Sequence, residues 1–365
     1  MPEENSLLLK EIINRDRLAH IAQETAAISS GFDAARFKAL AMENLDGLAI
    51  MQRIRRVATS LHLTLPGSYA DNVDVLCALA PRINHSFASI ALAEYVALYG
   101  QDHFDLSMKA LRFLTRFGSA EFAVRPFLAR DLERTLTVME GWARDENEHV
   151  RRLASEGSRP RLPWSFQLKE LVVDPQPVAC ILEALKSDPS LYVRKSVANH
   201  LNDITKNHPG WVLERLAQWP MDNPHTKWIA RHALRTLIKK GDRGALAVIG
   251  AGGRTQVRIA NFAIVPSGIT LGERIALNAS IISTSDQPQR LVVDYAIHYV
   301  KKSGMPSRKV FKLKEMDLTP ADTRELSASQ LIRDFTTRKH YAGHHRVELV
   351  VNGEVLAESG FELTI

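Results

Sequence analysis

The stretch YVRKSVANHLND, residues 192 to 203, has the apolar spacing of an amphipathic helix. Val193, Val197 and Leu201 recur every four residues, and Ile204 follows three residues later. Side chains at three- and four-residue spacing lie on one face of a helix, so we expect these four to form a buried stripe. Lys195, at a different phase, would lie on another face with Asn199 and Asp203.

Two other segments align with this stretch without gaps. They are HVRRLASEG at 149–157 and WIARHALRTLIKKG at 228–241, and the alignment brings Val150, Val193 and Ile229 into register. The offsets of 43 and 36 residues lie within or close to the range for HEAT-like helical repeats. Corresponding helices of such an array stack and line one surface. The stretch therefore predicts an α-solenoid.

The repeat lies within a longer helical region that ends near residue 250. Apolar residues also recur with helical spacing in Ile90–Leu98, Met108–Phe117 and Ala179–Leu185. After Gly250 to Gly253 the pattern changes to alternating, β-branched segments such as VRIANFAIV and RLVVDYAIHYV. We predict a multidomain α plus β chain, with an N-terminal α-solenoid of HEAT-like repeats over residues 1–250. A small all-β immunoglobulin-like sandwich would follow over residues 255–365.

Composition places the chain among ordinary globular proteins. Of its 365 residues 45% are hydrophobic and 24% charged. The N-terminus, MPEENSLLLKEIINRDRL, is too polar for a secretory leader, and we expect a cytoplasmic protein without membrane contact. Cys77 and Cys180 are the only cysteines. They fit neither a disulfide framework nor a zinc motif, and we expect both to be buried.

The positive charge is concentrated in the middle of the chain. Lys and Arg number 17 against 12 Asp and Glu over residues 145–254, which accounts for five of the six net positive charges. The repeat register puts Arg152, Lys195 and Arg231 at equivalent positions, and Arg235 and Lys239 would continue the third row. Pairing of Arg152 with Glu156 at i,i+4 is one explanation for the first unit. The third row contains no such acid, so an anionic ligand such as a phosphate backbone is the other explanation.

The segment EHVRRLASEGSRPRLPW, residues 148–164, combines a repeat helix with an unusual ending. We expect Gly157 to stop the helix, and the two following prolines to restrict a short extended loop. Such a loop could direct Arg159 and Arg161 toward phosphate and place Trp164 beside them.

The helical region resembles the HEAT-like alkylpurine DNA glycosylases, in particular the AlkC branch. The resemblance rests on FLTRFGSAEFAVRPFL (113–128), WARDENEHVRRLASEGSRPRLPW (142–164), LYVRKSVANHLNDITKNHPGWV (191–212) and the helix of 228–241. Some members of that branch have an immunoglobulin-like C-terminal domain, which agrees with the second domain. The resemblance implies hydrolysis of the N-glycosidic bond of cationic alkylated bases, chiefly 3-methyladenine and also 3-methylcytosine, in duplex DNA. It implies an abasic-site product and neither metal nor organic cofactor.

Carried over by motif, the resemblance implies a set of site residues. Glu121, Glu156 and Asp203 would be the catalytic carboxylates, while Trp164 and Arg152 would bind the lesion or brace its site. Carboxylates suit the oxocarbenium-like sugar and the attacking water. Each assignment has an alternative: Glu121 as an acid in the first turn of a helix, Asp203 bonded to backbone at a helix end, and Trp164 as a packing residue.

The DNA-binding residues expected from the loop, the repeat rows and the resemblance are basic. They are Arg159, Arg161, Arg194, Lys195, Lys206, Lys227, Arg231, Arg235, Lys239 and Lys240. In the β domain the turn-like YVKKSGMPSRK could add a second contact through Lys301, Lys302, Arg308 or Lys309, or it could be a solvated hairpin.

We expect a monomer, located in the cytoplasm of a bacterium and nucleoid-associated when bound to DNA. The resemblance also implies that the lesion is not flipped into a deep pocket. A catalytic lysine for a lyase reaction is not distinguished, which favours a monofunctional glycosylase. Two alternatives remain, a non-catalytic HEAT-repeat scaffold for protein partners and an inactive DNA-binding relative.

Overall fold

The computed structural model describes residues 9–335 and 339–365, and the chain packs as two compact units. The first extends to Pro209 and includes Pro220–Ile229, and the second comprises Gly210–Trp219 with Ala230–Ile365. The change from helices to strands falls elsewhere, between Val248 and Val257. The last helices thus belong to the same compact unit as the strands, although the sequence suggested a boundary at 250 to 255. Residues 1–8, which form part of the N-terminus judged too polar for a leader, lie outside the described residues.

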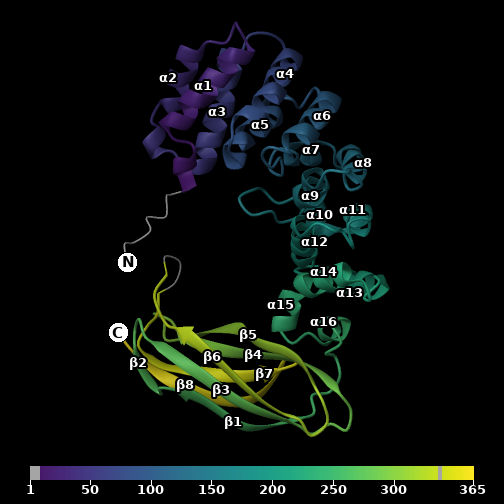
Figure 1. The fold of residues 1–365 in the computed structure, drawn as a ribbon, viewed down its shortest axis with the longest axis vertical. Coiled ribbons are helices and arrows are strands. Elements are labelled where there is room, and N and C mark those ends of the chain that lie inside the picture. The colour runs from purple at the N-terminus through teal and green to yellow at the C-terminus, as the bar shows by residue number, and fades with distance from the viewer. Residues whose placement is uncertain (1–8, 336–338) are drawn as a thin grey trace. The chain divides into compact units, whose positions relative to one another are not determined.

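Most of the chain before Val257 is helical (Figure 1). Short 3-10 turns lie at Leu9–Ile12, Leu45–Gly47, Ala80–Arg82 and Gln176–Val178. The α-helices of the described chain are, in order, α1 (Arg15–Ile28), α2 (Ala34–Met42), α3 (Ile50–Thr64), α4 (Tyr69–Leu79), α5 (Ser86–Tyr99), α6 (Phe104–Leu114), α7 (Arg125–Arg130), α8 (Leu132–Trp142), α9 (Glu148–Gly157), α10 (Lys169–Val173), α11 (Ala179–Ala184), α12 (Leu191–Ile204), α13 (Pro209–Gln218), α14 (Pro224–Ala233), α15 (Arg235–Lys239) and α16 (Arg243–Val248).

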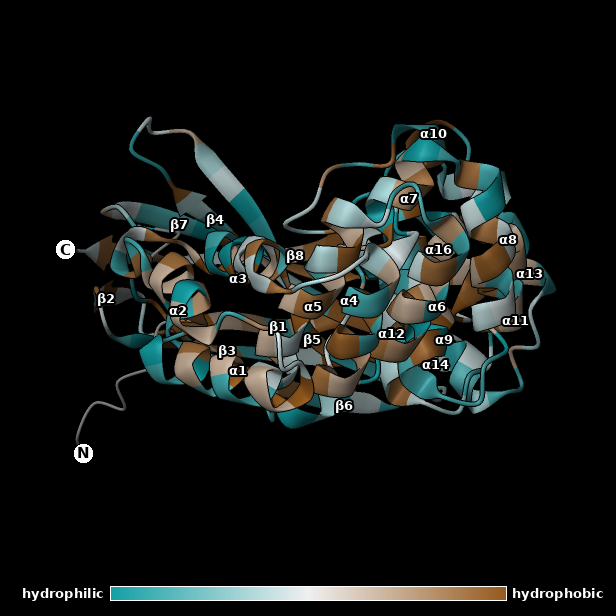
Figure 2. Cartoon of the chain, turned by 90° about the horizontal axis from the view of Figure 1, so that it is seen from above, coloured by the Kyte–Doolittle hydropathy of each residue, from teal (hydrophilic) through white to brown (hydrophobic). Residues whose placement is uncertain are grey.

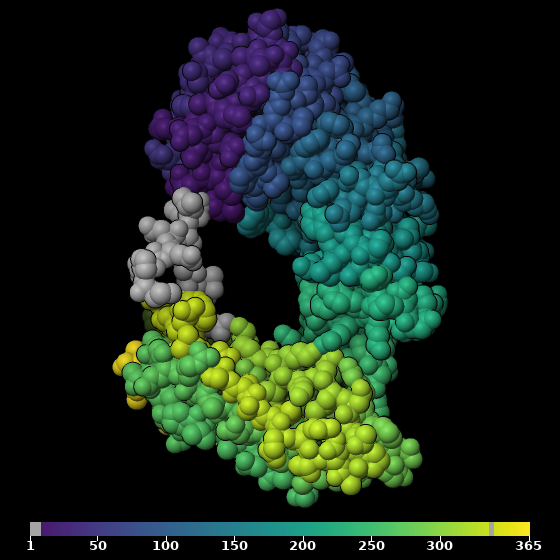
Figure 3. Space-filling view, viewed as in Figure 1, coloured from purple at the N-terminus to yellow at the C-terminus, as the bar shows by residue number. Residues whose placement is uncertain are grey.

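The predicted repeat register is confirmed by burial. Val150 on α9, Val193 on α12 and Ile229 on α14 are all at most 1% exposed, and the stripe from Val193 to Ile204 is buried throughout. Helices α9 and α12 pack against each other. In Figure 2 brown apolar residues alternate with teal polar residues along the helices, as expected when each helix buries one face. Figure 3 shows that side chains fill the spaces between successive helices of the first unit.

Local sequence explains where α9 begins and ends. The Asn147 side chain accepts a hydrogen bond from the His149 backbone N–H at 3.0 Å, which satisfies one donor of the first helical turn. At the other end, a Cβ on Gly157 would lie 2.5 Å from Val124 Cγ1. The glycine is required here for close approach to the segment before α7, in addition to ending the helix.

The second unit contains a sandwich of two β-sheets, as expected. Its strands are β1 (Val257–Val265), β2 (Gly268–Thr270), β3 (Arg274–Ser283), β4 (Gln289–Val300), β5 (Pro306–Leu318), β6 (Thr323–Leu331), β7 (Gly343–Val351) and β8 (Glu354–Thr364). One sheet has the order β1-β3-β6 and the other β2-β8-β7-β4-β5, with β2 parallel to β8 and the other pairs antiparallel. Apolar side chains from both sheets, among them Ile275, Leu277, Tyr295 and Ile297, form the core between them.

Close backbone contact joins the last helices to this sandwich. The turn between α15 and α16 meets the turn between β7 and β8, where a Cβ on Gly241 would lie 2.9 Å from Gly353 Cα. Both glycines have positive φ, at 76° and 82°, so other residues would be strained there as well as crowded. This contact helps to explain why the compact unit includes helices that the sequence assigned to the first domain.

Three local expectations need correction. The segment 228–241 is not one helix, because α14 ends at Ala233 and α15 begins at Arg235. The helix expected to reach Phe117 ends at Leu114. Cys180 is exposed and Cys77 is only half-buried, so neither is the buried residue that was expected. Among the described residues, no helix has the length and apolar character needed to span a membrane.

Candidate active site

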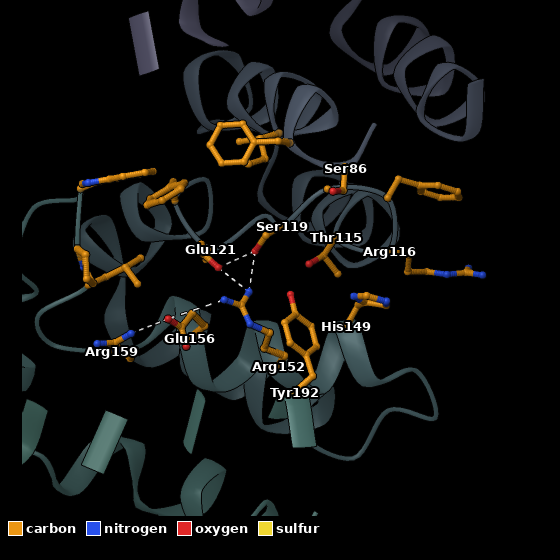
Figure 4. Close-up of a pocket in the computed structure, with 18 residues that line it drawn as sticks. Ser86, Thr115, Arg116, Ser119, Glu121, His149, Arg152, Glu156, Arg159 and Tyr192 are labelled. Atoms are coloured by element: carbon orange, nitrogen blue, oxygen red, sulfur yellow. Dashed lines mark hydrogen bonds and ion pairs between the residues drawn. The ribbon is translucent and has the colours of Figure 1, made fainter. Parts of the chain in front are cut away.

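A cavity of about 480 Å³ lies in the first unit, bordered by α5, α9, α12, the segment between α6 and α7, and the loop after α9 (Figure 4). Its lining combines charged and hydroxyl side chains with aromatic and aliphatic ones. The lining residues are Ser86, Phe87, Ile90, Thr115, Arg116, Phe117, Gly118, Ser119, Glu121, Phe122, His149, Arg152, Glu156, Arg159, Leu162, Pro163, Trp164 and Tyr192. Four of the five residues expected to act on the lesion therefore lie at one cavity, and Asp203 is the exception.

Glu121 is held in a fixed orientation at this cavity. Its Oε2 accepts hydrogen bonds from Ser119 Oγ at 2.7 Å and from Arg152 Nη1 at 2.5 Å. The same Arg152 nitrogen also donates to Ser119 Oγ at 2.9 Å, which closes a three-membered cluster. Because α7 begins only at Arg125, Glu121 precedes the helix, and the alternative of an acid in a first helical turn does not apply.

Charges of alternating sign continue from Glu121 into the protein. Arg152 Nη2 lies 3.8 Å from Glu156 Oε1, and Arg159 Nη1 lies 2.6 Å from the same oxygen. Arg159 also binds Asp203 Oδ2, through Nη2 at 2.8 Å and Nε at 2.9 Å. We call Glu121, Arg152, Glu156, Arg159 and Asp203 the ion-pair ladder. Lys206, a further cation, lies 3.0 Å from Asp203 Oδ1 at its far end.

The ladder changes the expected roles of two residues. Asp203 is 4% exposed and reaches the cavity only through Arg159, and its partners are side chains, so the alternative of a backbone bond at a helix end is wrong. Arg159 was expected on an exposed loop facing phosphate, but it is 7% exposed and paired with two carboxylates. The sequence did not reveal that Glu156 and Asp203 enclose it from two different helices.

The electrostatics of the ladder favour fully charged arginines. Burial lowers the pKa of Arg152, but the charges of Glu121 and Glu156 outweigh burial, and the pKa lies above its ordinary value. For Arg159 burial is likewise outweighed, here by Glu156 and Asp203. The partly buried ion pairs are costly to break because each carboxylate would lose its counter-ion in a poorly solvated position.

Trp164 lies on the loop between α9 and α10, residues 158–168, which we call the Trp164 loop. Its side chain is 64% exposed, which contradicts the alternative of a packing residue. Its backbone has φ of 65°, in the left-handed region that bulky residues avoid. A tryptophan kept exposed in a strained conformation suggests a role in binding, since packing does not require it.

Tyr192 and His149 also line the cavity and were missed by sequence reasoning. Both precede the valine of their repeat, and Trp228 occupies the same position in the third repeat. The His149 and Tyr192 rings meet edge to face with centroids 5.5 Å apart, and the Arg152 guanidinium lies 4.7 Å from the Tyr192 ring centroid. The repeat register therefore contained this signal, as a column of aromatic residues.

Arg194 has a structural role that also appears in the preceding repeat. Its Nη1 donates to the carbonyls of Asp188 and Pro189, six and five residues earlier, at 2.9 and 2.7 Å. Arg151, its repeat equivalent, donates to the carbonyls six and five residues before it at 3.0 and 2.9 Å. Each arginine thus fixes the loop that enters its own helix.

The remaining expected DNA-binding residues fall into two groups. Lys195, Lys227, Arg235, Lys239 and Lys240 are exposed, although Arg235 also donates to the His232 carbonyl at 2.6 Å. Others are bonded within the protein. Arg161 donates to Asn207 at 2.7 Å and to Gln167 at 3.1 Å, and Lys206 pairs with Asp203 as above.

The repeat row suggested that Arg231 is an unpaired cation, but it has a partner. It binds Glu315 of β5 at 2.5 Å, and the helix break at Leu234 removes Arg235 from its i,i+4 row. The pairing of Arg231 depends on a strand that the repeat alignment did not include.

The β4–β5 hairpin contains Lys301, Lys302, Arg308 and Lys309, as the turn-like segment predicted. Arg308 Nε donates to Glu348 on β7 at 2.9 Å, so this residue is part of the sheet surface. Among residues 9–335 and 339–365, no three His, Cys, Asp or Glu side chains gather closely enough to hold a metal ion.

Comparisons with known proteins agree with this arrangement. Residues 94–240 match the family described as DNA alkylation repair enzyme, and residues 258–365 match the family described as uncharacterised protein YhaZ, C-terminal Ig-like domain. Uncharacterized protein YhaZ of Bacillus subtilis (strain 168) is 41% identical over 356 residues, which cover 97% of this chain and 99% of that protein.

A solved structure is similar over nearly the whole chain. It is the Pseudomonas fluorescens alkylpurine DNA glycosylase AlkC bound to DNA containing an abasic site analog, and it is 55% identical with a TM-score of 0.95. The similarity covers 98% of this chain and 99% of that one, including both the helical and the immunoglobulin-like parts. The chain therefore belongs to the AlkC branch of the HEAT-like alkylpurine DNA glycosylases.

Proposed function

We propose that this protein is a monofunctional DNA glycosylase for cationic alkylated bases. It hydrolyses the N-glycosidic bond of 3-methyladenine, and also of 3-methylcytosine, in duplex DNA and leaves an abasic site. The observation that carries the proposal is the cavity in which the carboxylate of Glu121 faces the same space as the exposed Trp164. The similar AlkC structure, described as an alkylpurine DNA glycosylase on abasic-site DNA, supports it.

The chemistry requires little more than oriented negative charge. A base methylated at N3 already carries a positive charge, so it leaves without much help from a general acid. The sugar develops oxocarbenium character, which a carboxylate stabilises, and a carboxylate can also orient the attacking water. Glu121 suits this role because Ser119 and Arg152 hold it from one side, through Oε2. We assign Glu156 and Asp203 to maintaining the ladder, with Asp203 acting through Arg159.

Aromatic rings around the cavity support recognition of a cationic base. Trp164 and Tyr192 line the cavity, and a cation on the face of such a ring gains about 0.5 to 2 kcal/mol. The neutral, unmodified base does not gain this term, so the rings supply discrimination. The exposure of Trp164 supports a lesion that stays accessible and is not enclosed in a deep pocket.

Backbone binding is assigned to the exposed cations, above all Lys195 and Lys227. Phosphate contacts by such residues supply sequence-independent affinity that falls with salt. We propose that the protein acts as a monomer on double-stranded DNA, and that the β4–β5 hairpin adds a contact through Lys301 and Lys302. Among the described residues that line the cavity there is no lysine, which supports base release without a Schiff base.

The test is release of free 3-methyladenine from methylated duplex DNA. Glu121→Gln should lower kcat by on the order of 100-fold, because it removes charge at the sugar. Glu94→Gln is a matched control, since Glu94 has a similarly buried side chain (12% against 14% exposed) paired with Arg55 at 2.8 Å. Equal rates for Glu121→Gln and Glu94→Gln would remove Glu121 from the mechanism.

A second pair tests the inner end of the ladder. Asp203→Asn should lower base release, whereas Asp188→Asn should not, although Asp188 is equally buried and binds Arg151 through both oxygens. Failure of the wild type to release a base from any alkylated substrate would leave the scaffold or inactive DNA-binding alternatives. Borohydride trapping of the protein on DNA would contradict the monofunctional assignment.

A further inference from the structure

One buried arginine next to the cavity takes no part in the ion-pair ladder. Arg125 opens α7, is fully buried, and directs its guanidinium at backbone carbonyls. Nη1 donates to the Gly157 carbonyl at 2.9 Å and to the Arg159 carbonyl at 2.7 Å. Nη2 donates to the Phe166 carbonyl at 2.5 Å. A single side chain therefore binds the backbone on both sides of Trp164.

These bonds close the Trp164 loop at its base. Two of the three carbonyls precede Trp164 by five and seven residues, and the third follows it by two. The Phe166 ring also lies over the guanidinium, with its centroid 5.4 Å away. Within the loop, the Leu168 N–H donates to the Pro160 carbonyl at 3.1 Å, which also joins the segments before and after Trp164.

The loop needs such a restraint because of the conformation at its tip. Trp164 has φ of 65° and a mostly exposed side chain, so neither its own backbone preference nor burial holds it in place. A strained residue persists only where its surroundings determine its conformation. Arg125, which lies outside the loop, binds backbone on both sides of the tip.

We propose that Arg125 is a positioning residue for base release, which fixes the Trp164 loop so that Trp164 and Arg159 keep their places at the cavity. It touches neither the lesion nor the sugar and acts through the loop. This inference rests on the proposed glycosylase function. A displacement of about 1 Å at a site can reduce a rate about 100-fold, so a loosened loop has a measurable consequence.

The protein contains a matched control for a buried arginine of this kind. Arg53 on α3 is 1% exposed and also binds three backbone carbonyls, those of Lys10, Ile13 and Leu48, at 2.8 to 3.2 Å. It lies outside the set of residues that line the cavity. Arg53→Met and Arg125→Met therefore remove the same number of hydrogen bonds to carbonyls. Arg53→Met does so outside the cavity, and Arg125→Met does so at the base of the Trp164 loop.

The experiment measures single-turnover base release by the full chain, at a temperature where every variant is folded. Arg125→Met should lose about 30- to 100-fold, Arg125→Lys less, and Arg53→Met under threefold. In a double-mutant cycle, Arg125→Met should add little to the loss already caused by Trp164→Ala, since both disable one loop. If Arg125→Met does not fold, Arg125→Lys carries the same comparisons.

Three results would overturn the inference. The first is a loss for Arg125→Met that equals that of Arg53→Met, and the second is a loss that multiplies fully with that of Trp164→Ala. The third is an unchanged hydrogen-exchange rate at the Leu168 amide in Arg125→Lys, which reports loop order without DNA. A wild type that releases no base would instead refute the proposed function, and the catalytic part of this inference with it.

Discussion

The fold should weaken as the pH falls, because His200 cannot accept a proton in place. His200 lies on α12 and is fully buried. Burial, together with the nearby charge of Arg159, lowers the pKa of this imidazole from 6.5 to about 3. The Ser155 backbone opposes this shift of the pKa, while Arg125 acts in the same direction as burial and Arg159. In the folded protein the ring therefore stays neutral at pH values where the unfolded chain is protonated.

The magnitude follows from the two pKa values. Above pH 7.5 the ring is neutral in both states, and His200 makes stability neither rise nor fall with pH. Between pH 6.5 and 3 the unfolded state binds one proton more than the folded state. The free energy of unfolding therefore drops by about 1.4 kcal/mol for each unit by which the pH falls. At pH 5 the loss relative to pH 8 amounts to about 2 kcal/mol.

The assay is urea denaturation of the wild type and of His200→Leu at pH 8 and pH 5. The difference in free energy of unfolding between the two proteins should shift by about 2 kcal/mol toward the variant at the lower pH. A constant difference for His200→Leu would refute the reasoning, because it would mean that His200 accepts its proton in the folded state.

Three further predictions concern the ladder, the end of α9 and the β-sandwich. Arg159→Met should lower the free energy of unfolding by about 3 to 5 kcal/mol at pH 8, since it removes a counter-ion from each of two buried carboxylates, Glu156 and Asp203. Adding Asp203→Asn should recover part of this loss in urea denaturation. Gly157→Ala should cost about 1 to 3 kcal/mol through its clash with Val124, and the compensating change Val124→Ala should reduce that cost in the same assay. Burial raises the pKa of Asp294 from 3.8 to about 6. The folded state therefore lowers its stability above pH 6 by holding a buried charge, and this cost is absent below pH 3.8, where the carboxyl is protonated in both states. Asp294→Asn should therefore stabilise by about 3 kcal/mol at pH 8 and by little at pH 3.5, measured by thermal or urea unfolding at both pH values.

The sequence predicted what depends on local periodicity. The stripe headed by Val193, the repeat register and the change from helices to strands near residue 250 follow from spacing alone, and the structure confirms them. Tyr192 was within reach of the same register, because its position is aromatic in the neighbouring repeat too. The expected association of Glu121, Arg152 and Glu156 is present as contacts, although their catalytic roles stay predictions.

What the sequence could not give depends on partners distant along the chain. Arg231 appeared unpaired because its partner, Glu315, lies on β5, 84 residues away. Arg159 appeared exposed because a proline-rich segment suggests a solvated loop. The burial of Arg159 depends on Asp203, which lies 44 residues later in the sequence, on α12. Charge pairing between different helices and strands is not periodic, so no pattern in the sequence predicts it.

The paired bonds of Arg151 and Arg194 have a consequence for how such a protein can change over evolutionary time. Each arginine restrains the loop that leads into its own helix, using the carbonyls five and six residues before it. These carbonyl bonds are inherited together with the repeat when a gene segment is duplicated or lost. The ion pair of Arg151 with Asp188, which lies in the entry loop of the next repeat, instead depends on the neighbour. A copied repeat therefore keeps its carbonyl bonds, while its stacking faces and its ion pairs to other repeats must adapt.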